Sequence, residues 1–365
     1  MLIGLYNEVL MKPVIICGGV GAKMWPASRK KSPKHFLPLL KGKSLFQWNW
    51  ESLRKKFDAK DIYVQTTAEQ ADLVRKQVSE VLLENIFVEP ELRNQGPATG
   101  FAAAMLYKID PDEPFMLVQV DDIRIPEQYF FETMDVCDRL ARTTKKYITG
   151  GFRPAFAITG NDWLIKGELE TEQDRVGVYK VEKFLWRGAG ENAKKQAEQY
   201  FNEGLALLHT NHTCMTPRSF LEMFKKYRME WYTPLMNIIE GGDVVQEYAK
   251  MPKGQLEDVT QLVHAAGESL VVELPFRWID IGTWESADIY LKEVGIHTHD
   301  ENVIEIDSDD NFIQAPKEKI VATIGINNII VIDTGDALLI CRKDQSGRVG
   351  EVVERLKLEG KTELL

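Results

Sequence analysis

The chain has 365 residues, more than one compact core usually holds, so two domains are expected. Apolar residues make up 44% and charged residues 27%, which is typical of a globular protein, and no apolar run approaches the length of a membrane span. The net charge of −10 argues against a protein that binds nucleic acid or anionic membranes with its whole surface. Clustered basic residues near the N-terminus therefore suit a small anionic ligand.

The cysteines and the first residues indicate a cytoplasmic protein. The four cysteines lie far apart and form no CxxC pair, so reduced thiols are expected. The first ten residues, MLIGLYNEVL, lack a basic n-region and a cleavage site, so a secretory signal is not expected.

Strands and helices alternate through the first 150 residues. Hydrophobic patterns predict strands over 14–17, 61–66, 86–88, 115–120 and 146–150. They predict helices over 44–57, 67–83, 98–108 and 126–142. Ser44 is expected to cap the first helix, and Thr67 with Gln70 resembles a capping box for the second. This alternation predicts an α/β fold with a Rossmann-like, doubly wound, mostly parallel sheet.

Three candidate ligand-binding segments each follow a predicted strand directly. They are a glycine-rich loop after 14–17, a loop containing Arg93, and the pair Asp121-Asp122. Ligands of such sheets bind at the carboxyl ends of the strands, so the three segments are expected to converge on one edge.

The pattern changes twice in the rest of the chain. Over 151–295 it is less regular, with a strand expected over 176–184 and helices over 193–204, 217–229 and 256–266. Beyond about residue 296, short strands separated by Asp, Asn and Gly predict a small all-β domain with a closing helix. We place the domains at 11–297 and 298–365. An exposed β edge in the second makes a homodimer an expectation.

The stretch 14–39, VIICGGVGAKMWPASRKKSPKHFLPL, is the richest in signals. Its three glycines allow a sharp turn that points backbone N–H groups at an anion, and several lysines and an arginine follow them. Taken alone, a tight turn with a solvated basic face explains this equally well, because neither the Walker A nor the dinucleotide-binding pattern is present.

Two aspartate-bearing segments could supply a metal site. Asp121-Asp122 ends a predicted core strand, and Asp280 lies within the segment WIDIGTW. Taken singly, each is most simply a cap or turn residue. Brought together, they could hold one hard divalent cation beside the phosphate-binding loop.

The whole glycine segment resembles the GG-x-G-T-R-L-W-P-x-S-R-x-x-x-P-K-x-F-L signature of the sugar-1-phosphate nucleotidylyltransferases, in its mannose-1-phosphate guanylyltransferase version. The matching residues are Gly18, Gly19, Gly21, Trp25, Pro26, Ser28, Arg29, Pro33, Lys34, Phe36 and Leu37. Lys23 replaces the signature's arginine. The resemblance runs from about Pro13 to the end of the chain. It implies a GT-A-like nucleotidyltransferase domain followed by a left-handed β-helix-like domain.

The resemblance also implies roles for single residues. Asp122 matches the aspartate of the family's P-A-D-H-x-I segment and Asp280 that of W-x-D-x-G-x-W, which makes both ligands of Mg²⁺. The implied nucleotide-binding residues are Gly18, Gly19, Gly21, Arg93 and Asn94, and Lys23, Arg29 and Lys34 would balance the triphosphate charge. The implied sugar-phosphate-binding residues are Gly160, Glu182 and Lys183. By periodicity alone, Glu182 and Lys183 would be outward charges on an edge strand.

Two segments on the sugar side depart from the family. P-T-x-P-E-T-G-Y-G-Y-I is present only as residues 154–164, PAFAITGNDWL, with Ile158 in place of the glutamate. Y-L-W-N-S-G corresponds to residues 206–211, ALLHTN, so the tryptophan and the asparagine after it are lost. The pairs His209/His212 and His297/His299 have no third ligand at metal-binding spacing, and no zinc site is assigned to them.

The implied reaction is nucleotidyl transfer from a nucleoside triphosphate, GTP in this family, to a hexose 1-phosphate such as mannose 1-phosphate, with release of pyrophosphate. Two alternatives remain open. One is a metal-dependent glycosyltransferase. The other is a non-catalytic or regulatory paralogue, which the altered sugar segments suggest.

Overall fold

The computed structural model describes residues 11–40, 42–155, 161–187, 191–295 and 302–365, without the side chains of 191–194. Contacts divide the chain into two compact units, which we describe separately. Unit 1 comprises Met1–Gly18, Ser52–Gln119 and Arg124–Trp278. Unit 2 comprises Gly19–Glu51, Val120–Ile123 and Ile279–Leu365. The domain limits expected from the sequence stay a prediction.

Unit 1 is built on a ten-stranded mixed sheet in the order β11-β8-β7-β9-β6-β10-β4-β1-β2-β3. Its strands are β1 (Lys12–Cys17), β2 (Tyr63–Thr67), β3 (Ile86–Glu89), β4 (Phe115–Gln119), β6 (Tyr147–Phe152), β7 (Trp163–Gln173), β8 (Val176–Leu185), β9 (Ala206–His209), β10 (Cys214–Met215) and β11 (Ser269–Glu273). The neighbours β4, β1, β2 and β3 are parallel, whereas β7, β8 and β9 pair antiparallel. The α/β, Rossmann-like expectation is confirmed, with antiparallel strands added at one end.

The parallel strands explain where the candidate segments leave the sheet. Because β1, β3 and β4 run in the same direction, the segments that follow them start from the same edge of the sheet. This is the edge at which the sequence predicted the ligand-binding loops.

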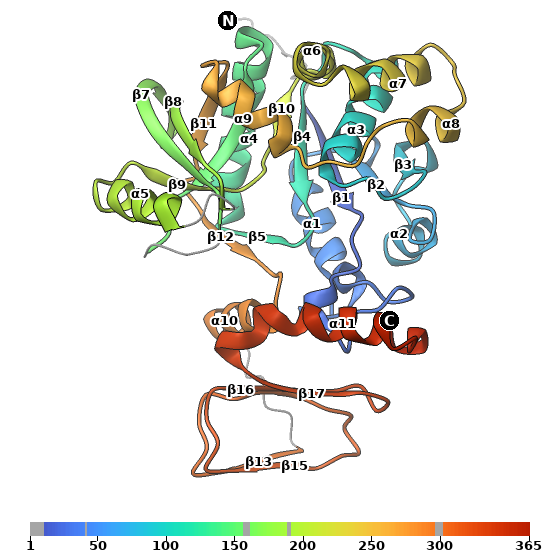
Figure 1. Cartoon of the computed structure of the whole chain (residues 1–365), viewed down its shortest axis with the longest axis vertical. Helices are drawn as coiled ribbons and strands as arrows, with labels where there is room; N and C mark the ends of the chain where they lie inside the picture. Colours follow the sequence, from blue (N-terminus) through green and yellow to red (C-terminus); the bar gives the residue numbers. More distant parts are fainter. Residues whose placement is uncertain (1–10, 41, 156–160, 188–190, 296–301) are drawn as a thin grey trace, which may run out of the picture. The chain divides into compact units, whose positions relative to one another are not determined.

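Helices cover both faces of the sheet in unit 1, namely α2 (Ala71–Gln77), α3 (Gln95–Ile109), α4 (Glu127–Thr144), α5 (Glu191–Asn202), α6 (Pro217–Tyr227), α7 (Met229–Ile239), α8 (Val244–Ala249) and α9 (Glu257–Ala265). Figure 1 shows α3, α6, α7 and α8 gathered on one side of β1–β4. They enclose a core of fully buried aromatic side chains that includes Phe115, Phe224 and Trp231. Helices α7 and α8 were not predicted.

One local prediction fails because strand pairing determines the position of the residue. Thr67 does not start a capping box, because it pairs with Glu89 as the last residue of β2. Helix α2 instead begins at Ala71 and ends at Gln77, since Val78 has an extended backbone. Asp122, in the pair that directly follows the predicted core strand, also lies in a strand. It begins the short strand β5 (Asp122–Ile125), which pairs with β12 (Arg277–Asp280).

Unit 2 combines the glycine loop, helices and a small β domain. Its helices are α1 (Leu45–Leu53, which continues into unit 1), α10 (Trp284–Glu293) and α11 (Val349–Leu358), and its β domain contains β13 (Val303–Ile306), β14 (Phe312–Gln314), β15 (Val321–Ile324), β16 (Ile329–Asp333) and β17 (Leu338–Arg342). Ser44 caps α1 as predicted: its Oγ accepts a hydrogen bond from the Gln47 N–H, and the Gln47 side chain bonds back to the Ser44 N–H, both at 3.0 Å.

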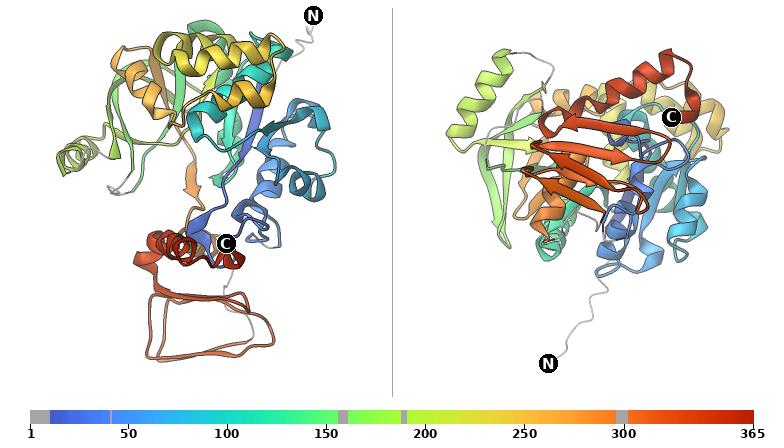
Figure 2. Two further views of the ribbon diagram at one scale, coloured as in Figure 1. Left: turned by 45° about the vertical axis from the view of Figure 1, so that its right-hand side comes forward. Right: turned by 90° about the horizontal axis from the view of Figure 1, so that it is seen from below.

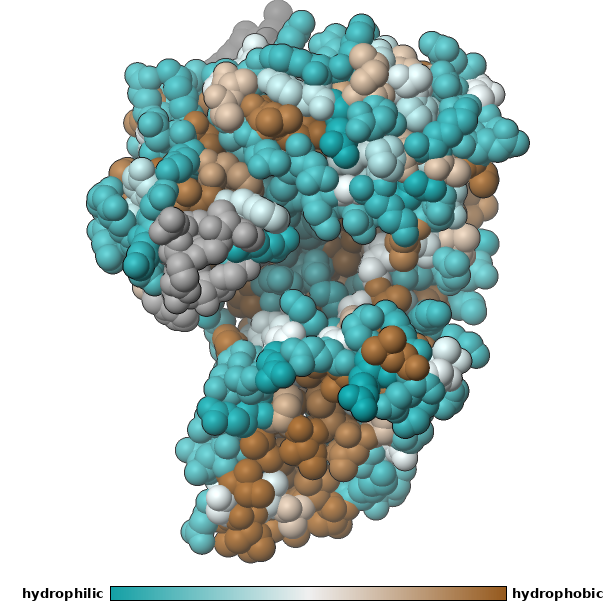
Figure 3. Space-filling view, viewed as in Figure 1, coloured by the Kyte–Doolittle hydropathy of each residue, from teal (hydrophilic) through white to brown (hydrophobic). Residues whose placement is uncertain are grey.

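The β domain has the layered form of a β-helix. Strands β13 and β15 pair in parallel in one layer, and β14 and β16 pair in parallel in another, with β17 antiparallel beside β16 (Figure 2). The predicted β-helix-like domain is thereby confirmed. Many of its apolar side chains are exposed, among them Ile304, Ile306, Ile320, Ile324 and Ile340. Figure 3 shows a hydrophobic area in the lower part of the molecule.

No helix among the described residues is long and apolar enough to cross a membrane.

Two buried histidines of unit 1 make its stability sensitive to acid. His212 and His264 are only 2% and 3% exposed, and burial lowers the pKa of His264 to about 3 and that of His212 well below its usual value. Below about pH 6.5, the two histidines are protonated in the unfolded chain but stay neutral in the folded chain until the pH reaches their lowered pKa values. The free energy of unfolding therefore falls as the pH drops. We expect the free energy of unfolding to decrease by roughly 1–2 kcal/mol per histidine between pH 7 and pH 5.

Urea unfolding at the two pH values checks this expectation. In the variant His264→Gln, the decrease in the free energy of unfolding between pH 7 and pH 5 should be smaller by the contribution of one histidine. Equal stability of the wild type at pH 7 and pH 5 would contradict it.

Candidate active site

Within unit 2, a buried tryptophan joins the glycine loop to the WIDIGTW segment. Trp284 is fully buried, and its indole N–H donates to the carbonyl of Trp25 at 3.0 Å. Thr283 and Ser286 form a capping box at the start of α10, which fixes where the segment turns into the helix. Two motifs about 260 residues apart are thus held together by a buried hydrogen bond.

Three carboxylates gather beside this junction. Asp121, Asp122 and Asp280 each place an oxygen within 4.8 Å of the others. The backbone fixes this grouping, because the Ile281 N–H donates to the Asp121 carbonyl at 2.9 Å. The Asn49 side chain also donates to the carbonyls of Val120 and Asp122, at 2.9 and 3.3 Å. The two aspartate segments expected to form one metal site are therefore together.

Lys34 enters the carboxylate cluster from the glycine segment. Its Nζ lies 2.6 Å from Asp121 Oδ2 and 3.2 Å from the carbonyl of Ile281. Burial opposes both charges, but the ion pair outweighs it: the pKa of Asp121 is lowered and the pKa of Lys34 is raised. One of the three carboxylates thus has an internal counterion.

Asp280 titrates differently. Asp280 is exposed at the surface, but its carboxylate lies close to other protein groups, among them the carboxylate of Asp121. Desolvation of this carboxylate, followed by repulsion from Asp121, raises the pKa of Asp280 to about 6, against the opposing effect of Lys34 and Lys23. A carboxylate held near others at this energetic disadvantage is a good ligand for a cation, which removes the repulsion.

The glycine turn allows Lys34 to reach this position. Gly21 has a φ of +85°, and a Cβ there would lie 2.5 Å from the Cγ of Lys34. The Lys34 N–H donates to the Val20 carbonyl at 3.0 Å, so the two ends of the loop are bonded. At Gly18 and Gly19 an added Cβ would meet no atom within 4 Å, so there is open space beside both residues.

The other two predicted charge-balancing residues differ in their surroundings. Lys23 is exposed on the short 3₁₀ helix Ala22–Met24. The guanidinium of Arg29 makes a bidentate contact with Asp336 at 2.6 and 2.8 Å and a further bond to Thr334. Arg29 therefore already has a carboxylate partner in the β domain.

The predicted residues of unit 1 lie on two separate elements. Arg93 and Asn94 precede α3; Arg93 bonds to Glu91 and to the carbonyl of Met251, and Asn94 has a φ of +66°. Glu182 and Lys183 are exposed on β8, as the periodicity suggested, and Lys183 Nζ donates to the Gln196 side chain at 2.6 Å. Gly160 and Ile158 lie outside the described residues.

Sequence reasoning missed two members of the site. Asp121 was noted beside Asp122 but given no role of its own, and Asn49 was read only as part of a helix. Asn49 is 2% exposed, and a buried amide needs several partners, but only the packed structure shows this burial.

Comparison with known proteins gives a consistent result. The nucleotidyl transferase family model matches residues 12–150, and the model of the MannoseP isomerase/GMP-like beta-helix domain matches residues 301–356. Mannose-1-phosphate guanylyltransferase 2 of Escherichia coli O157:H7 is 27% identical over 373 residues, covering 96% of this chain and 74% of the relative. A mannose-1-phosphate guanylyltransferase of Escherichia coli is 28% identical over 370 residues, covering 97% of this chain and 75% of that relative.

A solved structure shows the same fold over nearly the whole chain. The mannose-1-phosphate geranyltransferase from Thermus thermophilus, as it is described, superposes with a TM-score of 0.80 at 22% identity, covering 95% of this chain and 99% of that one. The chain thus contains a nucleotidyl transferase domain and a MannoseP isomerase/GMP-like beta-helix domain, and it is similar over nearly its whole length to mannose-1-phosphate guanylyltransferases.

Proposed function

We propose that the chain transfers the guanylyl group of GTP to mannose 1-phosphate, releasing pyrophosphate and forming a GDP-sugar. The observation that carries the reaction class is the cluster of Asp121, Asp122 and Asp280 beside Lys34 and the glycine turn, all within one compact unit. Carboxylates for a cation next to backbone N–H groups for phosphates are the parts that nucleotidyl transfer requires.

The carboxylate cluster fits Mg²⁺. Its donor atoms are all carboxylate oxygens, the ligands that this hard ion prefers. We propose that Asp122 and Asp280 bind the ion, whereas Asp121 is already neutralised by Lys34. Bound there, Mg²⁺ would neutralise charge on the triphosphate.

The chain has no need of a general base. A phosphate monoester has a second pKa of about 6 and is largely ionised near neutral pH, so the sugar phosphate oxygen can attack the α-phosphorus in line. The protein's contribution is to position the two substrates and to stabilise the charge on the leaving pyrophosphate. We assign the backbone N–H groups of Gly18, Gly19 and Gly21 to the triphosphate, with Arg93 and Asn94 at the nucleotide.

The cations of the loop would act on the triphosphate. Lys23 is exposed and adjacent to the cluster, and its charge already lowers the pKa of Asp280. Arg29 is bound to Asp336, but this pair is partly solvent-exposed and contributes at most about 1 kcal/mol, so a triphosphate can compete for the guanidinium.

The identities of the sugar and the nucleotide base are inferred from the relatives and not from the geometry of the site. Mannose and guanine are the substrates in the names of the relatives. Lys183, Glu182 and Gly160 would bind the sugar phosphate, yet the neighbouring segments 154–164 and 206–211 depart from the family. A pyrophosphate-release assay over several triphosphates and hexose 1-phosphates tests the proposal, and GTP with mannose 1-phosphate should give the highest rate.

The same assay separates the alternatives. A glycosyltransferase would consume a nucleotide sugar and release no pyrophosphate from a triphosphate. A non-catalytic paralogue would be inert with every pair of substrates. The cytoplasmic location expected from the sequence is part of this proposal. The homodimer stays a prediction, which light scattering of the purified protein can check.

Replacing Lys23 by arginine should raise turnover or the affinity for the triphosphate several-fold. Lysine keeps the positive charge of the family's arginine but lacks the bidentate guanidinium that matches two phosphate oxygens. Steady-state kinetics with varied triphosphate would measure the change.

The control is Lys30→Arg, since Lys30 is exposed in the same loop but lies outside the family signature. Unchanged kinetics in Lys23→Arg would show that this position does not contact the reacting phosphates.

A further inference from the structure

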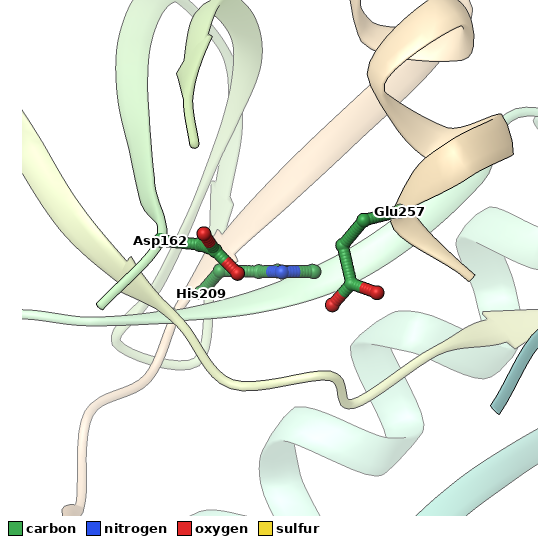
Figure 4. Close-up of side chains that lie close together, drawn as sticks. All are labelled: Asp162, His209 and Glu257. Carbon is green, nitrogen blue, oxygen red and sulfur yellow. The ribbon is translucent and has the colours of Figure 1, made fainter. Parts of the chain in front are cut away.

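A second cluster of metal-binding side chains lies in unit 1, apart from the carboxylates described above. It consists of Asp162, His209 and Glu257, each of which places a ligand atom within 4.8 Å of the other two. Figure 4 shows the imidazole of His209 extending from beside Asp162 toward the carboxylate of Glu257. Asp162 lies immediately before β7, His209 is the last residue of β9, and Glu257 is the first residue of α9.

The backbone fixes the first two residues of this cluster. The His209 N–H donates to the Asp162 carbonyl at 3.0 Å, as β9 pairs with β7. The Asp162 side chain accepts the backbone N–H of Arg187 at 2.8 Å, and the Arg187 guanidinium lies 3.7 Å from its other oxygen. Asp162 is 6% exposed, so its position is set by buried contacts.

Hydrogen bonding leaves one nitrogen of His209 available. Its Nε2 lies 3.0 Å from the hydroxyl of Thr149, which is fully buried. Its Nδ1 is shielded from solvent and has no hydrogen-bond partner among the described residues. When Nε2 donates its proton to the hydroxyl oxygen, Nδ1 carries a bare lone pair. Metal-binding histidines typically have this arrangement, with the second nitrogen bonded to an oxygen.

Glu257 is the third member of the cluster. It is only 7% exposed, and the described part of the chain offers its carboxylate no hydrogen bond or ion pair. A buried carboxylate without a partner is strongly disfavoured. Among the described residues, Arg187 forms an ion pair with Asp162, and no ion pair is found for Glu257.

The sequence differences from the family fall at the same place. In the segments quoted above, Asp162 stands where the family has glycine and His209 where it has asparagine. Neither family residue type is a usual metal ligand, whereas both replacements are. Two residues that differ from the family segments are thus two of the three clustered side chains.

We propose that Asp162, His209 and Glu257 bind a divalent transition-metal ion. One imidazole nitrogen and two carboxylate oxygens suit Zn²⁺, Mn²⁺ or Co²⁺, whereas Mg²⁺ prefers a site of oxygen atoms alone. Three protein ligands leave a coordination position open for water or for an oxygen of a bound substrate. The site is separate from the Mg²⁺ site proposed for Asp122 and Asp280.

Titration of the metal-free full-length protein with Co²⁺ and Zn²⁺ tests this proposal. Saturating Mg²⁺ is present, and calorimetry and the visible absorption of Co²⁺ are the readouts. We expect the wild type to bind one equivalent of Co²⁺ or Zn²⁺ tightly. The double variant Asp122→Asn/Asp280→Asn removes the first site and should retain this equivalent.

His209→Ala and Glu257→Gln should each weaken binding by at least about tenfold. The matched control Glu168→Gln removes an exposed carboxylate from β7 of the same unit and should change nothing. Circular dichroism identifies variants that fail to fold. The proposal is overturned if the folded wild type binds no Co²⁺ or Zn²⁺ under saturating Mg²⁺, or if its affinity is unchanged in folded His209→Ala. Both results are independent of catalytic activity.

Discussion

Asp280→Asn should reduce pyrophosphate release by at least about 100-fold, the loss typical of removing one group that stabilises charge in a transition state. The substitution keeps the size of the side chain but removes a carboxylate that we assign to Mg²⁺. Asp280 lies within 4.8 Å of Asp121 and Asp122, so no distant effect is needed to explain the loss. The measurement is kcat with saturating substrates, together with the Mg²⁺ concentration required for half-maximal rate.

The stability of this variant should move in the other direction. The pKa of Asp280 is raised to about 6 in the folded protein, above its value in the unfolded chain, so the ionised carboxylate destabilises the fold at pH 7. The neutral asparagine removes this repulsion, and Tm should be equal to or higher than that of the wild type. A loss of activity together with a loss of stability would instead indicate misfolding.

Asp307→Asn is a matched control, because Asp307 is exposed on the β domain and has a φ of +49°, which asparagine tolerates. Its activity should be unchanged. If Asp280→Asn were as active as the wild type, Asp280 would not bind a catalytic metal. If both proteins were inert with every substrate pair, the chain would not be an enzyme of this class.

Gly21→Ala should reduce activity by roughly 10- to 100-fold, because a displacement of about 1 Å in a positioning group can have an effect of this size. The new Cβ would lie 2.5–2.7 Å from three carbons of the Lys34 side chain, so that side chain must move. Its movement would break the 2.6 Å contact with Asp121 and leave a third uncompensated carboxylate in the cluster. The φ of +85° adds about 1–2 kcal/mol of backbone strain for alanine.

Gly42→Ala separates strain from collision. Gly42 has a φ of +79° in the same unit, but an added Cβ there meets no atom within 4 Å. The Gly42→Ala variant should lose a free energy of unfolding similar to the backbone strain expected in Gly21→Ala, whereas its kcat should stay near the wild-type value. Equal losses of kcat in both variants would show that the contact with Lys34 does not matter.

Local sequence was sufficient where the deciding contacts are local. The apolar run at 14–17 predicted β1, and Ser44 with Gln47 capped α1 as short-range hydrogen bonding requires. Thr67 shows the limit: its capping pattern was present, but pairing with Glu89 in the neighbouring strand decided its structure. Strand pairing joins residues far apart in sequence, so the local pattern could not reveal it.

The sequence by itself determined the fold class, the β-helix-like domain and the two aspartate segments, because these depend on hydrophobic period and matched motifs. Only the tertiary structure showed that Lys34 neutralises Asp121 across 87 residues and that Arg29 is held by Asp336. It alone brought Asp162, His209 and Glu257 together. A charged side chain's partner is set by which elements pack together, and packing depends on contacts that no local stretch of sequence contains.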